Sequence, residues 1–93
     1  MVIGLLTAEL GIDGANSLKD KRQVLKSLLA HLRADFNISA SEVADNDIWR
    51  KATIGIAVVA NDGVFAQQVL DKVVDHIEGD LRVDLGHYEI EML

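Results

Sequence analysis

Apolar residues alternate with polar or small ones at the start of the chain and again in its middle. In Val2–Ile12 most even-numbered positions are apolar, whereas the odd-numbered positions become polar at Thr7 and Glu9. A period of two residues predicts a strand with one buried face. Ala52–Ala60 has the same pattern, with small or β-branched residues at its odd positions. This second segment is typical of a central strand.

Two further segments have apolar residues at helical spacing. Ser17 and Asp20 have the spacing of a capping box, with aspartate in place of the usual glutamate, and they predict a helix from about Leu18 to about Asp35. Asn61 or Asp62 can cap a second helix, for which Gly79 is a stop signal. Its expected buried stripe is Phe65, Val69, Val73 and Ile77.

Two weaker strands complete the pattern. Asn37–Ala44 is more polar, as expected of an edge strand, and Leu81–Leu93 alternates towards its end. The resulting order, β-α-β-β-α-β, predicts an α+β fold of the ferredoxin-like kind, in which two helices cover one face of a four-stranded antiparallel sheet. We expect residues 1–93 to form a single domain of this fold.

The sheet face away from the helices is predicted to have an apolar centre. Glu9, Glu89 and Glu91 are expected along one margin of it. An exposed apolar centre favours self-association, so we expect a homodimer or a higher oligomer. The candidate interface residues are Ile3, Leu5, Thr53, Ala57 and Val59. An alternative function follows from this face, namely a homo-oligomeric module that binds a small ligand or regulates at the seam between copies.

The net charge of −6 argues against a protein that coats nucleic acid, because phosphates repel carboxylates. The charge is unevenly distributed, however. Residues 52–93 hold only Lys72 and Arg82 against eight acidic residues, whereas residues 1–51 are neutral overall. A contact with RNA is therefore expected to be local.

Cations gather on the first helix and in the turn before the third strand. Lys19, Arg22, Lys26 and Arg33 lie along one face of that helix, and Lys21 flanks them. The turn places Trp49 next to two cations, a composition suited to base stacking and phosphate binding. The candidate nucleic-acid-binding residues are Lys19, Lys21, Arg22, Lys26, Arg33, Trp49, Arg50 and Lys51. Two other interpretations remain open, a solvated helix face and a structural role for Trp49.

No catalytic or metal-binding motif is present. The chain has no cysteine, which excludes disulfides and thiolate metal sites. His87, Glu89 and Glu91 alternate along one strand, and such positions are roughly 7 Å apart, too far for a compact metal site. Ser17 is expected to use its oxygen as a helix cap. We therefore expect no catalytic residue, no enzyme activity, no metal and no cofactor.

The first residues are apolar but lack a basic leader, and no apolar run approaches the length of a membrane span. These features predict a cytoplasmic protein with no membrane partner.

Several short motifs together resemble a known family. The run Ser17-Leu18-Lys19-Asp20-Lys21-Arg22 opens the first helix, and Phe36-Asn37, Trp49, Asn61-Asp62 and Tyr88-Glu89-Ile90-Glu91 lie at the other element boundaries. Over nearly its whole length the chain is similar to the YlxP-like family of small bacterial proteins of unknown function. This resemblance implies a ferredoxin-like fold and no established catalytic residues. Family members are often encoded beside translation-initiation and ribosome-maturation factors. The resemblance therefore implies an accessory role with ribosomal RNA or a translation protein as partner.

Overall fold

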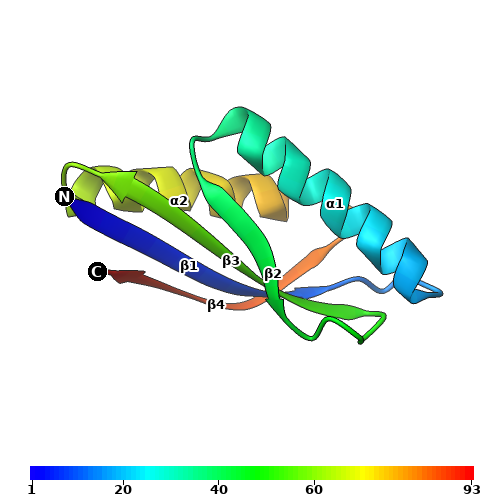
Figure 1. Cartoon of the computed structure of the whole chain (residues 1–93). Coiled ribbons are helices and arrows are strands. Elements are labelled where there is room, and N and C mark those ends of the chain that lie inside the picture. Colours follow the sequence, from blue (N-terminus) through cyan, green and yellow to red (C-terminus); the bar gives the residue numbers. More distant parts are fainter.

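The computed structural model describes residues 1–93 and consists of a four-stranded sheet with two helices on one face (Figure 1). The elements are β1 (Val2–Gly11), α1 (Leu18–Asp35), β2 (Ser39–Ala44), β3 (Lys51–Ala60), α2 (Gly63–Glu78) and β4 (Asp84–Met92). The strand order is β2-β3-β1-β4, and all neighbouring strands are antiparallel. This arrangement confirms the predicted ferredoxin-like fold.

Side-chain caps begin both helices. Ser17 Oγ accepts a hydrogen bond from the backbone N of Asp20 at 3.1 Å, and Asp20 Oδ2 accepts one from the backbone N of Asn16 at 3.0 Å. At the start of α2, Asp62 Oδ1 accepts from the backbone N of Phe65 at 2.8 Å. Asp62, rather than Asn61, is therefore the cap of the second helix. Each cap satisfies a backbone donor that the first turn leaves unpaired.

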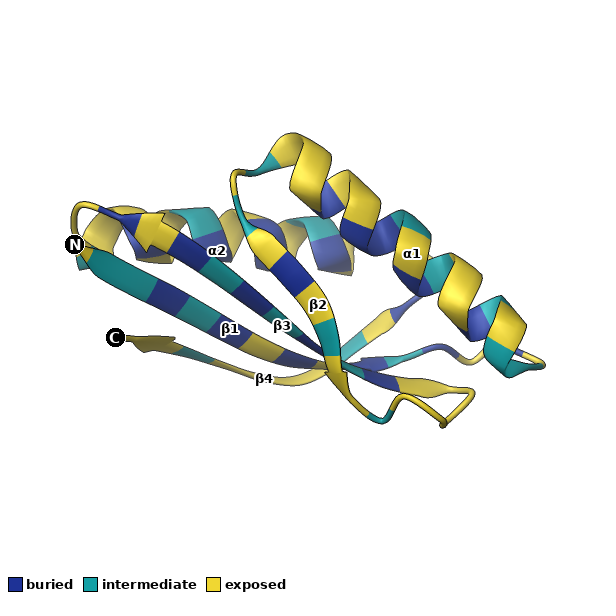
Figure 2. Ribbon diagram, viewed as in Figure 1, coloured by how far each residue is buried: buried dark blue, intermediate teal, exposed yellow.

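The core is the layer between the sheet and the helices. Leu6 on β1 and Ile56 on β3 are fully buried, as the alternating pattern predicts, and Figure 2 shows this alternation along both strands. The helix α1 packs against β2 and α2, whereas α2 packs against β1, β3 and β4. The helical part of the core consists of Leu25, Leu28, Leu29, Leu32, Ala66, Leu70, Val73, Val74 and Ile77. No helix is both long and apolar enough to cross a membrane.

The predicted buried stripe of α2 is wrong at its first residue. Phe65 is 55% exposed, and the first turn is buried through Ala66 instead. Residues four apart advance by about 400°, so a stripe built only from such steps drifts by about 40° each time. The residues Phe65 and Ile77 cannot therefore both face the sheet. Val73 and Ile77 do lie in the core, and Val69 is partly buried.

The turn between α2 and β4 is closed by a charged pair. Arg82 Nη2 donates to Asp80 Oδ2 at 2.6 Å, and Arg82 Nε donates to Asp80 Oδ1 at 3.0 Å. These hydrogen bonds hold the pKa of Asp80 below its ordinary value. Arg82 is thereby committed to its own turn, which leaves Lys72 as the unpaired cation of the acidic second half.

Gly4 on β1 is the point where α2 comes closest to the sheet. A Cβ atom at this position would lie 3.1 Å from each of Ala66 Cβ, Leu70 Cδ1 and Val58 Cγ1. These three contacts come from the helix and from the neighbouring strand, so none of them is the free end of an exposed side chain. A larger residue would therefore push α2 away from the sheet.

We predict that Gly4→Val lowers the free energy of unfolding by about 1–3 kcal/mol, because it overpacks a filled core. Urea unfolding measured by circular dichroism checks this value. Gly14→Ala is the matched control, since a Cβ atom added there would have no neighbour within 4 Å and the φ of Gly14 is not positive. This control is expected to be neutral, or stabilising by up to about 1 kcal/mol. Equal destabilisation by both changes would contradict the packing argument.

Candidate functional site

The start of α1 is joined to the β2–β3 turn by a buried lysine. Lys21 is fully buried, although the sequence places it on the flank of an exposed basic stripe. Its Nζ atom donates to the backbone O of Asp45 at 2.5 Å and lies 2.9 Å from Glu42 Oε2. Lys21 therefore lies inside the protein, where its positive charge compensates the negative charge of Glu42. We leave Lys21 out of the candidate surface.

Glu42 depends on Lys21 for the compensation of its charge. Its Oε2 atom is buried and accepts no well-aligned hydrogen bond, so the ammonium group beside it is its only charged partner. Its Oε1 atom faces Asn46 Nδ2 at 3.5 Å. Removing one member of such a pair leaves the other charge without a partner in a poorly solvated place, which costs more than the pair itself contributes.

Asp45 receives contacts from three side chains, one on α1 and two on β3. Its φ of 64° lies in the left-handed region, which aspartate tolerates better than most residues. Its carbonyl accepts from Lys21, and its Oδ2 atom accepts from Thr53 Oγ1 at 2.6 Å. Lys51 Nζ lies 3.9 Å from the same Oδ2 atom. The turn is therefore held at its first residue by Lys21 of α1 and by Thr53 and Lys51 of β3.

Two of the candidate arginines also make structural contacts. Arg50 Nε donates to the backbone O of Ala15 at 3.0 Å, and the backbone O of Arg50 accepts from the backbone N of Ile12 at 2.9 Å. Arg33 Nη2 donates to the backbone O of Ala40 at 2.5 Å and so joins α1 to β2. Both side chains have exposed atoms but are fixed at one end. Arg50 therefore fastens the far end of the turn, as Lys21 fastens its beginning.

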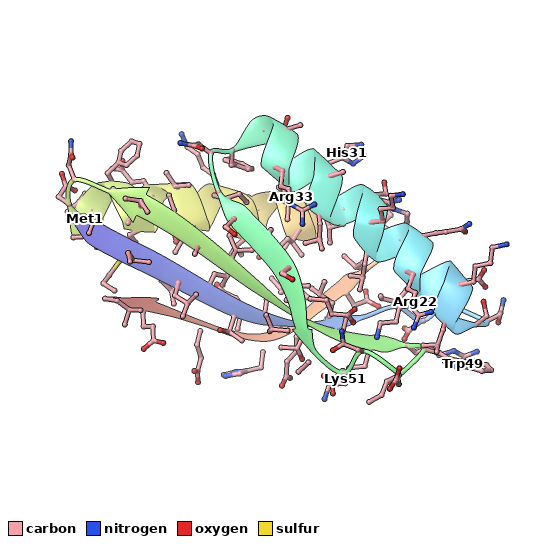
Figure 3. All side chains as sticks on the ribbon, viewed as in Figure 1. Met1, Arg22, His31, Arg33, Trp49 and Lys51 are labelled. Carbon is pink, nitrogen blue, oxygen red and sulfur yellow. The ribbon has the colours of Figure 1, made fainter.

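The remaining cations of α1 are exposed and unpaired. Lys19, Arg22 and Lys26 form no ion pair and no side-chain hydrogen bond. Trp49 is 51% exposed at the tip of the fastened turn. Figure 3 shows Arg22 and Trp49 at the same end of the molecule, whereas Arg33 lies farther along α1. We call Lys19, Arg22, Lys26 and Trp49 the basic corner.

The open face of the sheet carries the five predicted interface residues, of which four are apolar and Thr53 is polar. The register pairs Leu5 with Ala57, and Ile3 with Val59, on the side away from the helices. Thr53 lies on the same face and is paired with Glu9. Val59 is 65% exposed, and Ile3 and Leu5 are partly exposed. The structure therefore brings these residues together on one surface.

Glutamates line the β4 margin of this face. Glu91 is paired with Leu5, and Glu89 with Thr7. His87 Nε2 lies 3.1 Å from Glu89 Oε1, and both side chains are largely exposed. No group of three or more histidine, aspartate or glutamate side chains is arranged to hold a metal ion. The oxygen of Ser17 accepts the helix-capping hydrogen bond, as its position predicts.

The sequence analysis missed two exposed apolar residues, Val43 and Phe65. Val43 is exposed and lies over Gly55, where a Cβ would be 3.1 Å from Val43 Cγ1. Ser39, Ser41 and Val43 alternate along β2, so Val43 lies on the open face with the two serines, next to a β-bulge between Glu42 and Ala44. Phe65 lines a shallow hollow with Met1 and Val59. The 40° drift of the α2 pattern could have revealed Phe65, and the alternation with Ser39 and Ser41 could have revealed Val43.

The fold and these surfaces define a small α+β protein of the ferredoxin-like class. Two designed proteins of solved structure share this fold. One is a protein named LFR1 1 with a ferredoxin fold, with a TM-score of 0.60 and 12% identity over 98% of this chain and 85% of that one. The other is the designed protein Foldit4, with a TM-score of 0.54 and 9% identity over 100% of this chain and 97% of that one. These likenesses concern the fold alone.

Within this class the chain belongs to a family described as a protein of unknown function, DUF503, whose model matches residues 3–90. It is 38% identical over 77 residues to the uncharacterized protein YlxP of Bacillus subtilis strain 168, an alignment that covers 83% of this chain and 84% of that protein. The resemblance to the YlxP-like family is thus confirmed. The family has no assigned function, and nothing in the chain points to catalysis.

We predict that Lys21→Met destabilises the protein by about 3 kcal/mol, because it leaves the Glu42 carboxylate partly buried without its counter-charge. Replacing both residues, as Lys21→Met with Glu42→Leu, is expected to recover most of that loss. Lys26→Met is the control, since Lys26 is an exposed lysine of the same helix and its change is expected to stay within about 0.5 kcal/mol. Urea unfolding of the four proteins measures these values. A double variant as unstable as Lys21→Met would contradict the charge-compensation argument.

Proposed function

We propose that this chain is a non-enzymatic accessory protein that binds RNA of the translation apparatus through the basic corner. The observation that carries the proposal is that Lys19, Arg22 and Lys26 are exposed on one helix and that none of them forms an ion pair with a carboxylate. Cations without a protein partner are free to replace the counterions of a phosphate backbone.

The spacing of these cations supports contact with a polyanion. Arg22 and Lys26 are like charges four residues apart, an arrangement that weakens a helix by a few tenths of a kcal/mol. Lys19 and Lys26 are about 10 Å apart along the helix axis, so together the three cations follow almost two turns. An extended anion such as RNA relieves their mutual repulsion, whereas a single small anion reaches only part of the row.

Trp49 supports RNA over other anions. Its half-exposed ring stands on a turn that Lys21 fastens at Asp45 and that Arg50 fastens at Ala15. A ring on a rigid support can stack on an unpaired base with little loss of side-chain entropy. Basic side chains together with such a ring bind both the backbone and the bases of single-stranded RNA.

The open sheet face does not support RNA binding. Sheet-face recognition of RNA in domains of this architecture uses aromatic residues on the central strands. Here the corresponding positions hold Leu5, Thr53 and Ala57. Glu89 and Glu91 add negative charge along the same face. A bound RNA is therefore expected to follow α1 rather than the sheet.

The translation apparatus as the source of the RNA rests on the resemblance to the YlxP-like family, whose members are often encoded beside translation factors. The net charge of −6 agrees with a local contact rather than a coating of RNA. The non-enzymatic role is supported by the oxygen of Ser17, which is engaged as a helix cap.

The charge contribution can be tested with matched variants. Arg22→Glu is expected to weaken binding to a purified, labelled ribosomal RNA, whereas Lys72→Glu, an identical charge change on the exposed part of α2, is expected to have little effect. Fluorescence anisotropy at several salt concentrations measures both. The triple variant Lys19→Glu, Arg22→Glu, Lys26→Glu should lower affinity about tenfold or more and reduce the salt slope by about 2. Equal effects of Arg22→Glu and Lys72→Glu would show that only net charge matters and would contradict the basic corner.

The contribution of Trp49 is tested separately. Trp49→Ala is expected to weaken binding to single-stranded RNA by about 5- to 100-fold, because it removes one base-stacking contact, and to leave the salt slope unchanged. Trp49→Phe keeps an aromatic surface and should retain most of the affinity. The thermal midpoint of each variant serves as the folding control. If alanine and phenylalanine reduce affinity equally while both variants stay folded, Trp49 does not stack on a base.

A further inference from the structure

We propose that the open face of the sheet is a homodimer interface, in which two copies pack face to face about a two-fold axis parallel to the strands. This surface is separate from the basic corner, so the proposal goes beyond RNA binding. It rests on how apolar, small and charged residues are arranged in rows across the face.

The antiparallel register aligns residues in rows that cross all four strands. One row runs from β2 to β4 through Ser39, Ala57, Leu5 and Glu91. The next row runs through Ser41, Gly55, Thr7 and Glu89. Each row therefore begins with a hydroxyl group, has small or apolar residues in its middle, and ends with a carboxylate.

A two-fold axis parallel to the strands exchanges the two halves of every row. It places β1 of one copy over β3 of its partner and keeps each row opposite itself. Leu5 then lies over Ala57, a large side chain over a small one, and Ile3 lies over Val59. Such alternation of large and small residues is how two packed sheets interdigitate.

The charges select this axis over the other one in the sheet plane. With the axis parallel to the strands, Glu91 lies over Ser39 and Glu89 over Ser41, so each carboxylate faces a hydroxyl donor. An axis perpendicular to the strands would instead place β4 over β4. Two sets of Glu89 and Glu91 would then meet in a poorly solvated interface, and like charges there are unfavourable.

The area of the open face sets the expected affinity of the dimer. Four strands span about 19 Å across, and Ile3 to Glu9 span about 20 Å along the strands. The resulting footprint of roughly 400 Å² per copy lies below the ~800 Å² of a standard stable interface. Val43 adds apolar surface to the face, and Phe65 lines a hollow together with Val59. We therefore expect a weak, reversible dimer with a dissociation constant between about 1 μM and 1 mM.

The proposed dimer also determines where the basic corners of its two copies lie relative to each other. Sheets that pack face to face leave both α1 helices on the outer layers, on the order of 30 Å apart. Because the axis is parallel to the strands, both β2–β3 turns lie at the same end of the assembly. One RNA long enough to reach both corners would then be held at two points.

The test is the solution mass of the RNA-free protein, measured by sedimentation over a range of concentrations. The wild type is expected to change from monomer to dimer with increasing concentration. Val59→Glu and Leu5→Glu are expected to raise the dissociation constant at least about tenfold, because each buries a charge without a partner. Leu81→Glu is the matched control, since Leu81 is 99% exposed outside this face and should leave the dimer intact. Val59 is already 65% exposed, so its variant is expected to fold even if Leu5→Glu does not.

Cross-linking tests the axis. The chain has no cysteine, so single cysteines can be introduced without a background. A mixture of Ser39→Cys and Glu91→Cys is expected to form covalent dimers with a short bis-maleimide, and each variant alone is expected to form few. Cross-linking of Glu91→Cys alone, without the mixed product, would overturn the proposed axis.

A wild type that remains monomeric up to about 1 mM would overturn the dimer, because even a weak specific pair forms at that concentration. A dimer that survives both glutamate variants would also overturn it and would point to pairing at a strand edge. Loss of a protein partner from lysate on Val59→Glu, with a monomeric wild type, would assign the face to a different protein. None of these results depends on RNA, so the two proposals can fail independently.

Discussion

The alternation of side chains along β1 and β3 is the constraint on which the rest of the structure depends. Each residue of these central strands that fills the core leaves its neighbours on the opposite face. Burial of Leu6 and Ile56 under the helices therefore requires Leu5 and Ala57 to lie on the open face. The core and the exposed apolar surface are thus two sides of one pattern, and neither can be changed in register without the other.

A second constraint is that several cations of the first half of the chain are engaged in contacts within the protein. Six of the seven basic residues in the first half occur either on α1 or in the turn that leads to β3, and their side chains have different roles. Lys21 compensates Glu42 inside the protein, and Arg50 and Arg33 donate to backbone carbonyls. What remains for a partner is a smaller set, exposed at the end of the molecule where Trp49 stands. The contacts of Lys21 and Arg50 also make the turn a rigid support for that ring.

Much of the architecture could be predicted from the sequence because its signals are local. Ser17, Asp20 and the apolar spacing after them locate α1 from Leu18 to Asp35, as the structure has it. The odd positions of β1 and β3 lie on the open face for the same local reason. Phe65 was wrongly predicted to be buried, and the cause is geometric. Residues four apart in a helix drift around its axis, so a short helix is compatible with several choices of buried stripe. The face of Val43 follows from the same alternation, since it lies two residues beyond Ser41, whereas the β-bulge beside it depends on pairing with β3.

The sequence by itself determined the order of the elements, the start of each helix and the buried face of each central strand. Those properties follow from periodicity and from caps that span only a few residues. Only the tertiary structure decided which lysines are free, because Lys19, Lys21 and Lys26 share one helix and differ in what lies opposite them. The partner of Lys21 is Glu42, which is distant in the chain and is brought near by the packing of β2 against α1. Burial of a charge is a property of such long-range neighbours, and no local pattern records it.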